Sequence, residues 1–388
     1  MRSRMNDVSS SMVCQWALDW LLQAQLLKAD GYKCTPTLVW SMILRAAAHT
    51  ISVFAACRDV AKAPTSQAIF DALLRGLPKT RSVLERRLNE SLTNSLSRSM
   101  RRRKWRVAID WHLVPYYGEH QQSRNELYHS RAQLGTTTFH AYATACIVDH
   151  GHRYTLALTD VRQHESMTTV LTRLLDQIER LGLKIRHLLL DAAFYNVAVI
   201  EFLQARKLPF IMPAVLRGRK PKRGTPKTGL RAIEQHGAGC YQHTMQRGQQ
   251  QAQVSICVSY KTYYRAGKKP RQTKKLLFAV WRVKGTPVEI REQYRLRFGI
   301  ETSYRQRRQA RIYTCTRDPQ LRLVFVAVSL LLRNLWVWVH ATHLGDETRT
   351  GKQLRLELLR FKQLLEWISR SILDTWHYNS LPKINNSE

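Results

Sequence analysis

The sequence is poor in acidic residues. Only 28 of its 388 residues are Asp or Glu, against 62 Lys and Arg, so its formal net charge is +34. An excess of this size repels itself unless a polyanion shares the surface, which disfavours a small-molecule enzyme and favours nucleic acid as the partner. A membrane surface is the second candidate. A disordered basic tail is excluded, because a chain with 44% hydrophobic residues can bury a core.

The sequence also lacks paired cysteines and targeting segments. Its seven cysteines are scattered without a CxxC spacing, so we expect no disulfide framework, no zinc ribbon and a reducing compartment. The N-terminus has no apolar region of the kind found in signal peptides. Leu323–His340 is the most apolar stretch, but Arg333 and Asn334 at its centre predict a buried core helix rather than a membrane span. We expect no membrane association.

The first part of the chain, residues 1–103, is predicted to be a helical DNA-binding region. Two short helices, Ile51–Lys62 and Gln67–Leu77, are joined by a tight turn in which Ser66 is the expected N-cap. Such a pair fits either a helix-turn-helix or a plain helical hairpin, and the net charge favours the first. A basic cluster follows, and its residues Arg102, Arg103 and Lys104 are expected to contact DNA.

The periodicity changes from helical to strand-like at Trp105. Residues 104–213 form a predicted α/β core in which three strands are followed by a helix, a strand, a helix and a strand. These elements are Arg106–Asp110, His140–Asp149, Arg153–Val161, Ser166–Leu181, Ile185–Leu190, Val197–Arg206 and Pro209–Pro213, with a tight turn at 150–152. In this pattern the fourth strand is expected to lie beside the first.

A basic, β-rich insertion is predicted at residues 214–285. Its strands are Ala252–Tyr260 and Lys275–Val283, and the loop between them mixes tyrosines with Lys and Arg. That mixture suits phosphate contact and base stacking, and a solvated hairpin is the alternative. Trp281, in the last strand, is assigned to DNA binding through stacking on an unpaired base, although core packing explains it more simply.

Helices are predicted for the rest of the chain. Thr286, Pro287 and Glu289 form a helix start that opens the final core helices, 286–345, and this first helix is expected to continue to Arg311. Gly299 inside it costs ~1 kcal/mol relative to Ala, which predicts close packing or a ligand there. The C-terminal region, 346–388, is expected to hold one amphipathic helix, Gln353–Trp376, and a tail.

Three carboxylates are the candidate catalytic residues. Asp110 and Asp191 each end an apolar strand, where an unpaired carboxylate is expensive to bury, and each alone is more simply a turn or capping residue. On neighbouring strands they would reach one divalent cation. Glu301 is the third, on a helical face within about 80° of rotation. The residues of that face are Tyr294, Arg297, Glu301, Arg305 and Arg308.

That helical face has two interpretations. Glu301 and Arg305 fit an ordinary surface ion pair four residues apart. Alternatively, the guanidinium groups around one acid suit phosphates, because the planar fork of Arg matches phosphate oxygens. A set of Asp, Asp and Glu oxygens suits two Mg²⁺ or Mn²⁺ ions, the cofactors we expect.

The spacing Tyr294-(2)-Arg297-(3)-Glu301-(6)-Arg308 resembles the Y-(2)-R-(3)-E-(6)-K signature of the DDE insertion-sequence transposases of the IS-four type. The resemblance covers roughly residues 104–345 and implies an RNase H-like catalytic core interrupted by a β-rich insertion. It also implies that Asp110, Asp191 and Glu301 hold the metal ions, and that Tyr294, Arg297 and Arg308 hold the phosphates of the transposon end. Arg308 departs from the pattern, which has Lys at this position.

The activity implied by this resemblance is nicking of DNA at insertion-sequence ends, followed by attack of the freed 3′-OH on target DNA. The implied partners are double-stranded DNA, as terminal inverted repeats and target, and a second copy of the chain in a homodimer on DNA. The implied location is the cytoplasm of a prokaryote, at the nucleoid. Two alternatives stay open: a non-catalytic, domesticated DNA-binding protein and a stand-alone RNase H-like nuclease.

Overall fold

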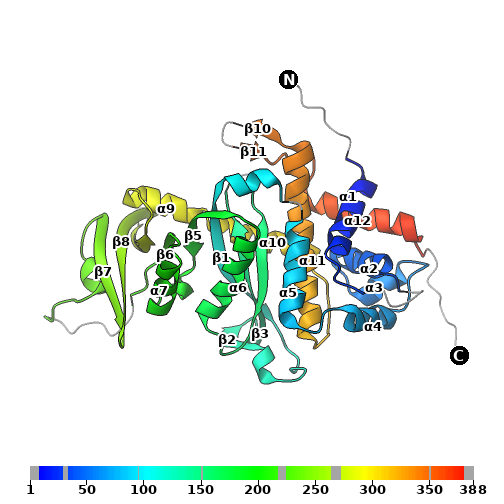
Figure 1. Cartoon of the computed structure of the whole chain (residues 1–388), viewed down its shortest axis with the longest axis horizontal. Coiled ribbons are helices and arrows are strands. Elements are labelled where there is room, and N and C mark those ends of the chain that lie inside the picture. Colours follow the sequence, from blue (N-terminus) through cyan, green and yellow to red (C-terminus); the bar gives the residue numbers. More distant parts are fainter. Residues whose placement is uncertain are drawn as a thin grey trace.

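The computed structural model describes residues 8–28, 34–94, 96–149, 152–216, 224–263, 272–348 and 351–379. Three parts follow one another along its longest axis (Figure 1). Helices from both ends of the chain lie at one end, a mixed β-sheet is in the middle, and a β-hairpin extension of that sheet forms the other end. The fold is therefore mixed α/β, as the sequence predicts.

The helical part joins the two ends of the chain. Its helix α12 (Phe361–Trp376) packs on α1 (Ser10–Gln23) and α2 (Pro36–His49), and the part also contains α3 (Val53–Arg58), α4 (Ser66–Gly76) and α5 (Arg81–Thr93). Three boundaries differ from the predictions. The helix predicted at 51–62 is only the short α3. The hydroxyl of Thr65, rather than that of Ser66, caps α4 by accepting from the N–H of Ala68. The last helix begins at Phe361, after the hairpin of β10 (Asp346–Thr348) and β11 (Gly351–Gln353).

The predicted core helix is confirmed as α11 (Pro319–Val339), which runs between the helical part and the sheet (Figure 1). Among the described residues, only Pro319–Leu344 forms a helical stretch long and apolar enough to cross a membrane, and 94% of its most apolar window is buried inside the protein. The polar residue Asn334 at the centre of this helix is accommodated in the core because its side chain forms hydrogen bonds there. The buried side chain of Asn334 donates to the carbonyls of Leu92 and Thr155 and accepts from the N–H of Thr155.

The central sheet has the strand arrangement of an RNase H-like fold. Its order is β4-β3-β1-β5-β6, with β3 antiparallel to β1 and β4, and with β5 and β6 parallel to β1. The strands are β1 (Lys104–Pro115), β3 (Thr136–Ile147), β4 (Thr155–Val161), β5 (Lys184–Leu190) and β6 (Phe210–Pro213), and β2 (Tyr128–Gln133) pairs with one end of β3. Helices α6 (Met167–Arg180) and α7 (Val197–Ala205) make the crossovers. The prediction that the fourth strand lies beside the first is confirmed.

Strand β1 is longer than predicted. It continues past Asp110 to Pro115, because its second half stays paired with β3 up to Pro115 opposite Phe139. Asp110 therefore lies inside a strand rather than at its end. The hairpin between β3 and β4 is confirmed by their antiparallel pairing, while residues 150 and 151 of its predicted turn lie outside the described residues.

The β-rich segment continues the central sheet. Strand β9 (Gln272–Trp281) pairs antiparallel with β6, and β8 (Gln250–Tyr263) and β7 (Gly239–Arg247) follow beyond it (Figure 1). Strand β7 was not predicted. Residues 217–223 of the basic stretch and residues 264–271 of the tyrosine-containing loop lie outside the described residues.

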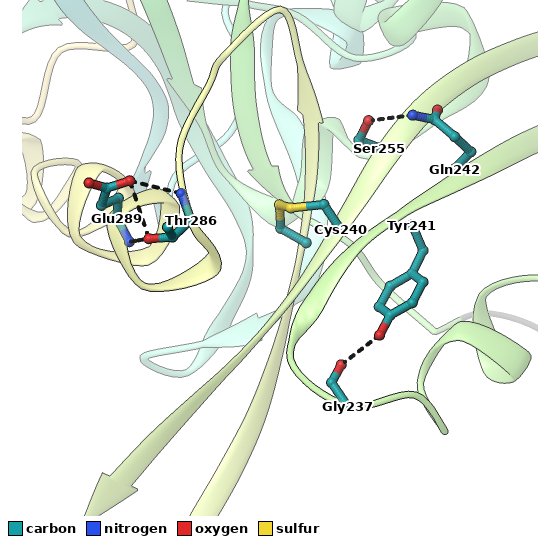
Figure 2. The surroundings of a disulfide bond; sticks show 8 residues. Gly237, Cys240, Tyr241, Gln242, Ser255, Thr286 and Glu289 are labelled. Carbon is teal, nitrogen blue, oxygen red and sulfur yellow. Dashed lines mark hydrogen bonds between the residues drawn. A yellow bond between two sulfur atoms is a disulfide. The ribbon is translucent and has the colours of Figure 1, made fainter.

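A disulfide joins β7 to β8, contrary to the expectation of none. Cys240 and Cys257 lie directly opposite each other in the antiparallel register, with their Cα atoms 4.2 Å apart (Figure 2). The sequence analysis missed this pair because strand register, rather than a short spacing, brings the two cysteines together. The other five cysteines are free: Cys14, Cys34, Cys57, Cys146 and Cys315.

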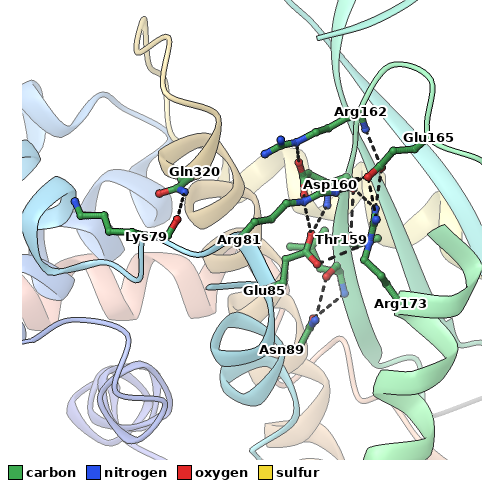
Figure 3. A network of polar contacts seen from close by, with 11 residues as sticks. Lys79, Arg81, Glu85, Asn89, Thr159, Asp160, Arg162, Glu165, Arg173 and Gln320 are labelled. Carbon is green, nitrogen blue, oxygen red and sulfur yellow. Dashed lines mark hydrogen bonds and ion pairs between the residues drawn. The ribbon is translucent and has the colours of Figure 1, made fainter. Parts of the chain in front are cut away.

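A polar network attaches helix α5 to the sheet (Figure 3). The guanidinium of Arg81 contacts Asp160 at 2.5 Å and Glu165 at 2.9 Å, and Asn89 exchanges two hydrogen bonds with the backbone of Leu158. Burial would raise the pKa of Glu165, but hydrogen bonds from Arg173 and Arg81 outweigh it and lower that pKa to about 2. These contacts fix the helical part against β4.

Candidate active site

Parallel pairing of β1 and β5 brings two of the predicted carboxylates together. The last paired positions are Ile109 and Leu190, so Asp110 and Asp191 occupy the next position on adjacent strands. Adjacent strands lie ~4.8 Å apart, and laterally paired residues point to the same face of a sheet. Asp110 stays within β1, while Asp191 follows β5 directly and precedes the short helix η3 (Ala192–Phe194).

The third carboxylate comes from a helix that is broken. As predicted, α9 (Pro287–Arg295) starts with a capping box between Thr286 and Glu289 (Figure 2). The helix does not run unbroken to Arg311: α10 (Phe298–Arg307) follows after two turn residues, and η4 (Arg308–Ala310) follows α10. At the break, the N–H groups of Leu296 and Arg297 bond to carbonyls three residues back instead of four.

This break divides the predicted polar face. Tyr294 and Arg297 are buried, Glu301 is partly exposed, and Arg305 and Arg308 are exposed. The predicted close packing at Gly299 is confirmed, because a Cβ there would lie 3.3 Å from the guanidinium of Arg153. Glycine thus lets α10 approach its neighbours just before Glu301.

The guanidinium of Arg297 lies at the point where the three carboxylates meet. Its Nη1 is 3.1 Å from Asp110 Oδ2, and its Nη2 is 2.8 Å from Glu301 Oε1 and 3.9 Å from Asp191 Oδ1. Only 9% of the Arg297 side chain is exposed, whereas the carboxylates of Asp191 and Glu301 are 43% and 38% exposed. One buried cation therefore links residues from β1, the end of β5 and α10.

The site is short of positive charge. Burial raises the pKa of Asp110 to about 6; Arg297 works against this shift, and the charges of Asp191 and Glu301 add to it. Burial would lower the pKa of Arg297, but Tyr294 and the three carboxylates outweigh it and raise that pKa. Three acids share a single arginine, so a further cation would be stabilised here.

The donor chemistry fits a hard divalent cation, because all three side chains offer carboxylate oxygens and that of Asp110 is mostly shielded from water. Within the described ranges, no three His, Cys, Asp or Glu side chains are already gathered around one ion position. The guanidinium of Arg297 takes the place between the acids.

Sequence reasoning missed four residues that support this arrangement. The hydroxyl of Tyr304 donates to the backbone carbonyl of Asp110 at 3.1 Å and contacts the hydroxyl of Thr144 at 2.6 Å, which fixes α10 against the sheet. His112 lies 4.8 Å from the Tyr304 ring, and Arg307 contacts His112. The period of two along a strand places His112 on the face of Asp110, and this signal was available in the sequence.

Trp281 does not reach the carboxylates. It pairs with Phe210, which pairs with Leu188, which in turn pairs with Val107. Asp110 is three positions beyond Val107 and therefore points to the opposite face of the sheet. Half-buried Trp281 stacks on Phe210 with ring centroids 6.3 Å apart, so packing explains its position.

The basic cluster at 101–104 also lies away from the carboxylates. Arg102, Arg103 and Lys104 are exposed where β1 begins, and six residues of strand correspond to ~20 Å between Lys104 and Asp110. Arg103 covers the ring of Trp105 at 4.5 Å. Any contact of this cluster with DNA would be made at a distance from the site.

Comparisons with known proteins give a matching family model and a similar solved structure. The family model described as transposase DDE domain matches residues 101–334, which include all three carboxylates. The solved structure of a piggyBac transposase synaptic complex with hairpin DNA is similar to this chain, with 12% identity and a TM-score of 0.53. The match covers 98% of this chain and 84% of that one, and it shows a shared fold. No curated protein sequence matches the chain.

Proposed function

Because the chain belongs to the transposase DDE domain family, we propose that it cuts DNA at insertion-sequence ends and joins the freed 3′-OH to target DNA, using Asp110, Asp191 and Glu301. One observation carries the proposal. Three carboxylates that are far apart in the sequence, on β1, after β5 and on α10, meet at Arg297. Fold stability does not require three converging acids, whereas phosphodiester cleavage with divalent metal ions needs such a set of carboxylates to hold them.

Asp110, Asp191 and Glu301 would together hold two divalent cations. When bound, such ions activate an attacking oxygen and stabilise the charge of the leaving oxygen. The protein's own part is positional. Tyr304 fixes the backbone of Asp110, and the parallel register fixes Asp191 beside it.

Arg297 would have two roles in this reaction. It keeps the acids together in the free protein, and its fork is suited to a DNA phosphate once further cations share the acids. Tyr294, beside the Arg297 guanidinium at 5.8 Å from ring centroid to Cζ, supports its orientation. Exposed Arg308 would contact a phosphate farther along the strand. We propose double-stranded DNA as the partner, as terminal inverted repeats and as target, with two copies of the chain holding two ends.

The test uses the DNA that flanks the gene. Purified full-length chain is incubated with a labelled duplex carrying a flanking terminal repeat, with Mg²⁺, with Mn²⁺ and with EDTA, and nicking and strand transfer are measured. We expect activity only with the metals. Asp110→Asn, Asp191→Asn and Glu301→Gln should each abolish it and keep DNA binding, while Asp374→Asn, an exposed acid on α12, should keep both.

Two outcomes would replace the proposal with one of the alternatives. Binding of the repeat without any metal-dependent cleavage favours the non-catalytic DNA-binding protein. Cleavage without strand transfer, and without preference for the repeat, favours a stand-alone nuclease.

A further inference from the structure

A basic cavity lies beside the carboxylates. Its volume is about 310 Å³, and it opens between the second half of β1 and the segment that joins α10 to α11. Four arginines line it, namely Arg307, Arg308, Arg311 and Arg322, and none of the described lining residues is Asp or Glu. Apart from Arg308, these arginines lie outside the four-residue signature of the helix.

Arg307 shows that this charge is uncompensated. It is only 7% exposed, and within the described part of the chain it forms no ion pair with a carboxylate. Its Nη2 contacts Nε2 of His112 at 2.5 Å, and its buried Nε has no hydrogen-bond partner. A guanidinium buried in this way is costly unless an anion joins it.

The excess of positive charge also affects the pKa values of His112 and Arg307. Burial and, to a smaller extent, the charges of Arg307, Arg308 and Arg311 together lower the pKa of His112 to about 3. Burial also lowers the pKa of Arg307 to about 10, with Arg311 and Arg308 contributing. The imidazole of His112 bears no negative charge, neutral or protonated, so its contact with Arg307 does not compensate the guanidinium.

The cavity lies close to the candidate active site along both β1 and α10. His112 follows Asp110 by two positions on the same face of β1, which is ~7 Å of strand. Arg307 follows Glu301 by six positions on α10, which is ~9 Å of helix. A nucleic-acid strand passing the carboxylates therefore reaches the cavity within a very few nucleotides.

We propose that this cavity binds a backbone phosphate of the DNA strand, close to the phosphodiester bond that is cut. Arginine forks match phosphate oxygens, and several of them around one phosphate explain why no acid lines the cavity. The wall of Tyr117, Phe325 and Val326 offers apolar contact to the adjoining sugar. This inference rests on the proposed function, because it assumes that the chain handles DNA.

The test measures how DNA affinity depends on salt. The probe is a fluorescent 30-base-pair duplex of arbitrary sequence with the full-length chain in EDTA, over a range of NaCl concentrations. Each phosphate contact contributes about 0.9 to the slope of log affinity against log salt. Arg311→Gln and Arg322→Gln should each reduce the slope by about one unit. Arg370→Gln removes one exposed charge on α12, outside the cavity, and should leave the slope unchanged.

Arg311 is exposed, so its variant should fold even if Arg322→Gln does not, since Arg322 Nε donates to the carbonyl of Thr316 at 2.7 Å. Thermal unfolding of each variant checks this. Slopes equal to wild type in Arg311→Gln would overturn the proposal, and so would an equal reduction in Arg370→Gln.

A second measurement separates DNA from a free anion. If inorganic phosphate raises the melting temperature of wild type but not of Arg311→Gln, while both proteins show the same DNA slope, the cavity takes free phosphate and the DNA proposal is wrong. The proposed catalytic function is judged separately, since the slope needs no cleavage. If Asp110→Asn loses cleavage while the cavity variants keep the wild-type dependence of DNA affinity on salt, only the cavity assignment is wrong and the proposed catalytic function stands.

Discussion

Arg297 donates from Nη1 to Oδ2 of Asp110 at 3.1 Å, across 187 residues of sequence. The same guanidinium contacts Glu301 one helical turn later and Asp191 directly after the neighbouring strand β5. This contact makes the free protein's site a cluster of acids held by one arginine. It also determines how the site should respond to pH, to charge removal and to added cations.

The pH dependence of stability should change when Asp110 is neutralised. Folding raises the pKa of Asp110 from 3.8 to about 6, so the ionised form is penalised in the folded state. That penalty is absent below pH ~4, grows between pH ~4 and ~6, and is complete above it. Asp110→Asn should therefore be more stable than wild type above pH 6, by on the order of 2 kcal/mol, and the difference should vanish near pH 4.

Urea unfolding in EDTA between pH 4 and pH 8 measures this difference. Asp374→Asn, which neutralises an exposed acid, is the control and should follow wild type throughout. A less stable Asp110→Asn at pH 8 would mean that the pair with Arg297 outweighs the burial of the carboxylate.

Removal of Arg297 should make the site depend on a divalent cation. Arg297→Gln leaves three neighbouring acids without their shared buried cation, which should lower the free energy of unfolding by ~3 kcal/mol. Millimolar Mg²⁺ should restore part of it, with a larger rise in melting temperature than in wild type. Thermal unfolding with and without Mg²⁺ gives both values.

Arg295→Gln is the matched control for Arg297→Gln. Arg295 pairs with Glu292 at 2.7 Å on the surface, where such a pair contributes under ~1 kcal/mol. If Mg²⁺ stabilises both variants equally, the three carboxylates do not form a cation site.

Arg308 should tolerate lysine better than a neutral residue. It is exposed at the edge of the cavity and stands where the transposase signature has Lys. Arg308→Lys keeps the charge that a phosphate requires, so substantial DNA cleavage should remain, whereas Arg308→Gln should lose at least tenfold. Rates of end cleavage for the two variants, at saturating and at limiting DNA, make the comparison. Equal rates for Lys and Gln would remove Arg308 from the phosphate contacts.

The network around Arg81 should stabilise the junction between helices and sheet in a pH-dependent way. The arginines hold the pKa of Glu165 at about 2, below the ordinary 4.5, so this stabilisation is complete above pH ~4.5 and is lost as the pH falls toward 2. Arg81→Met should cost ~3 kcal/mol at pH 7 and less at pH 3, because it removes one of the two arginines that hold Glu165, together with the close contact to Asp160.

Chemical unfolding at the two pH values tests the role of Arg81. The control is Arg86→Met on the same helix, where an exposed pair with Glu90 at 3.9 Å should contribute under ~1 kcal/mol. Equal losses in the two variants would show that the network adds nothing beyond a surface ion pair.

Much of this protein follows from local sequence pattern alone. The apolar run before Asp191 and the helix start at Thr286 are properties of a few adjacent residues, and the strand and the helix start are where the pattern predicts. The apolar stretch around Arg333 likewise predicts the buried helix α11. Net charge and the spacing from Tyr294 to Arg308 indicate the family, because a family signature records residue types at fixed distances along the sequence.

Tertiary structure alone determined which residues far apart in the sequence come into contact. The parallel register of β1 and β5 places Asp110 beside Asp191, and the break before Phe298 separates buried Arg297 from exposed Arg305. Pairing of β7 with β8 brings Cys240 to Cys257, and packing of α10 on β1 joins Arg307 to His112. These contacts depend on strand register and packing between segments far apart in the chain, and local periodicity carries no information about either.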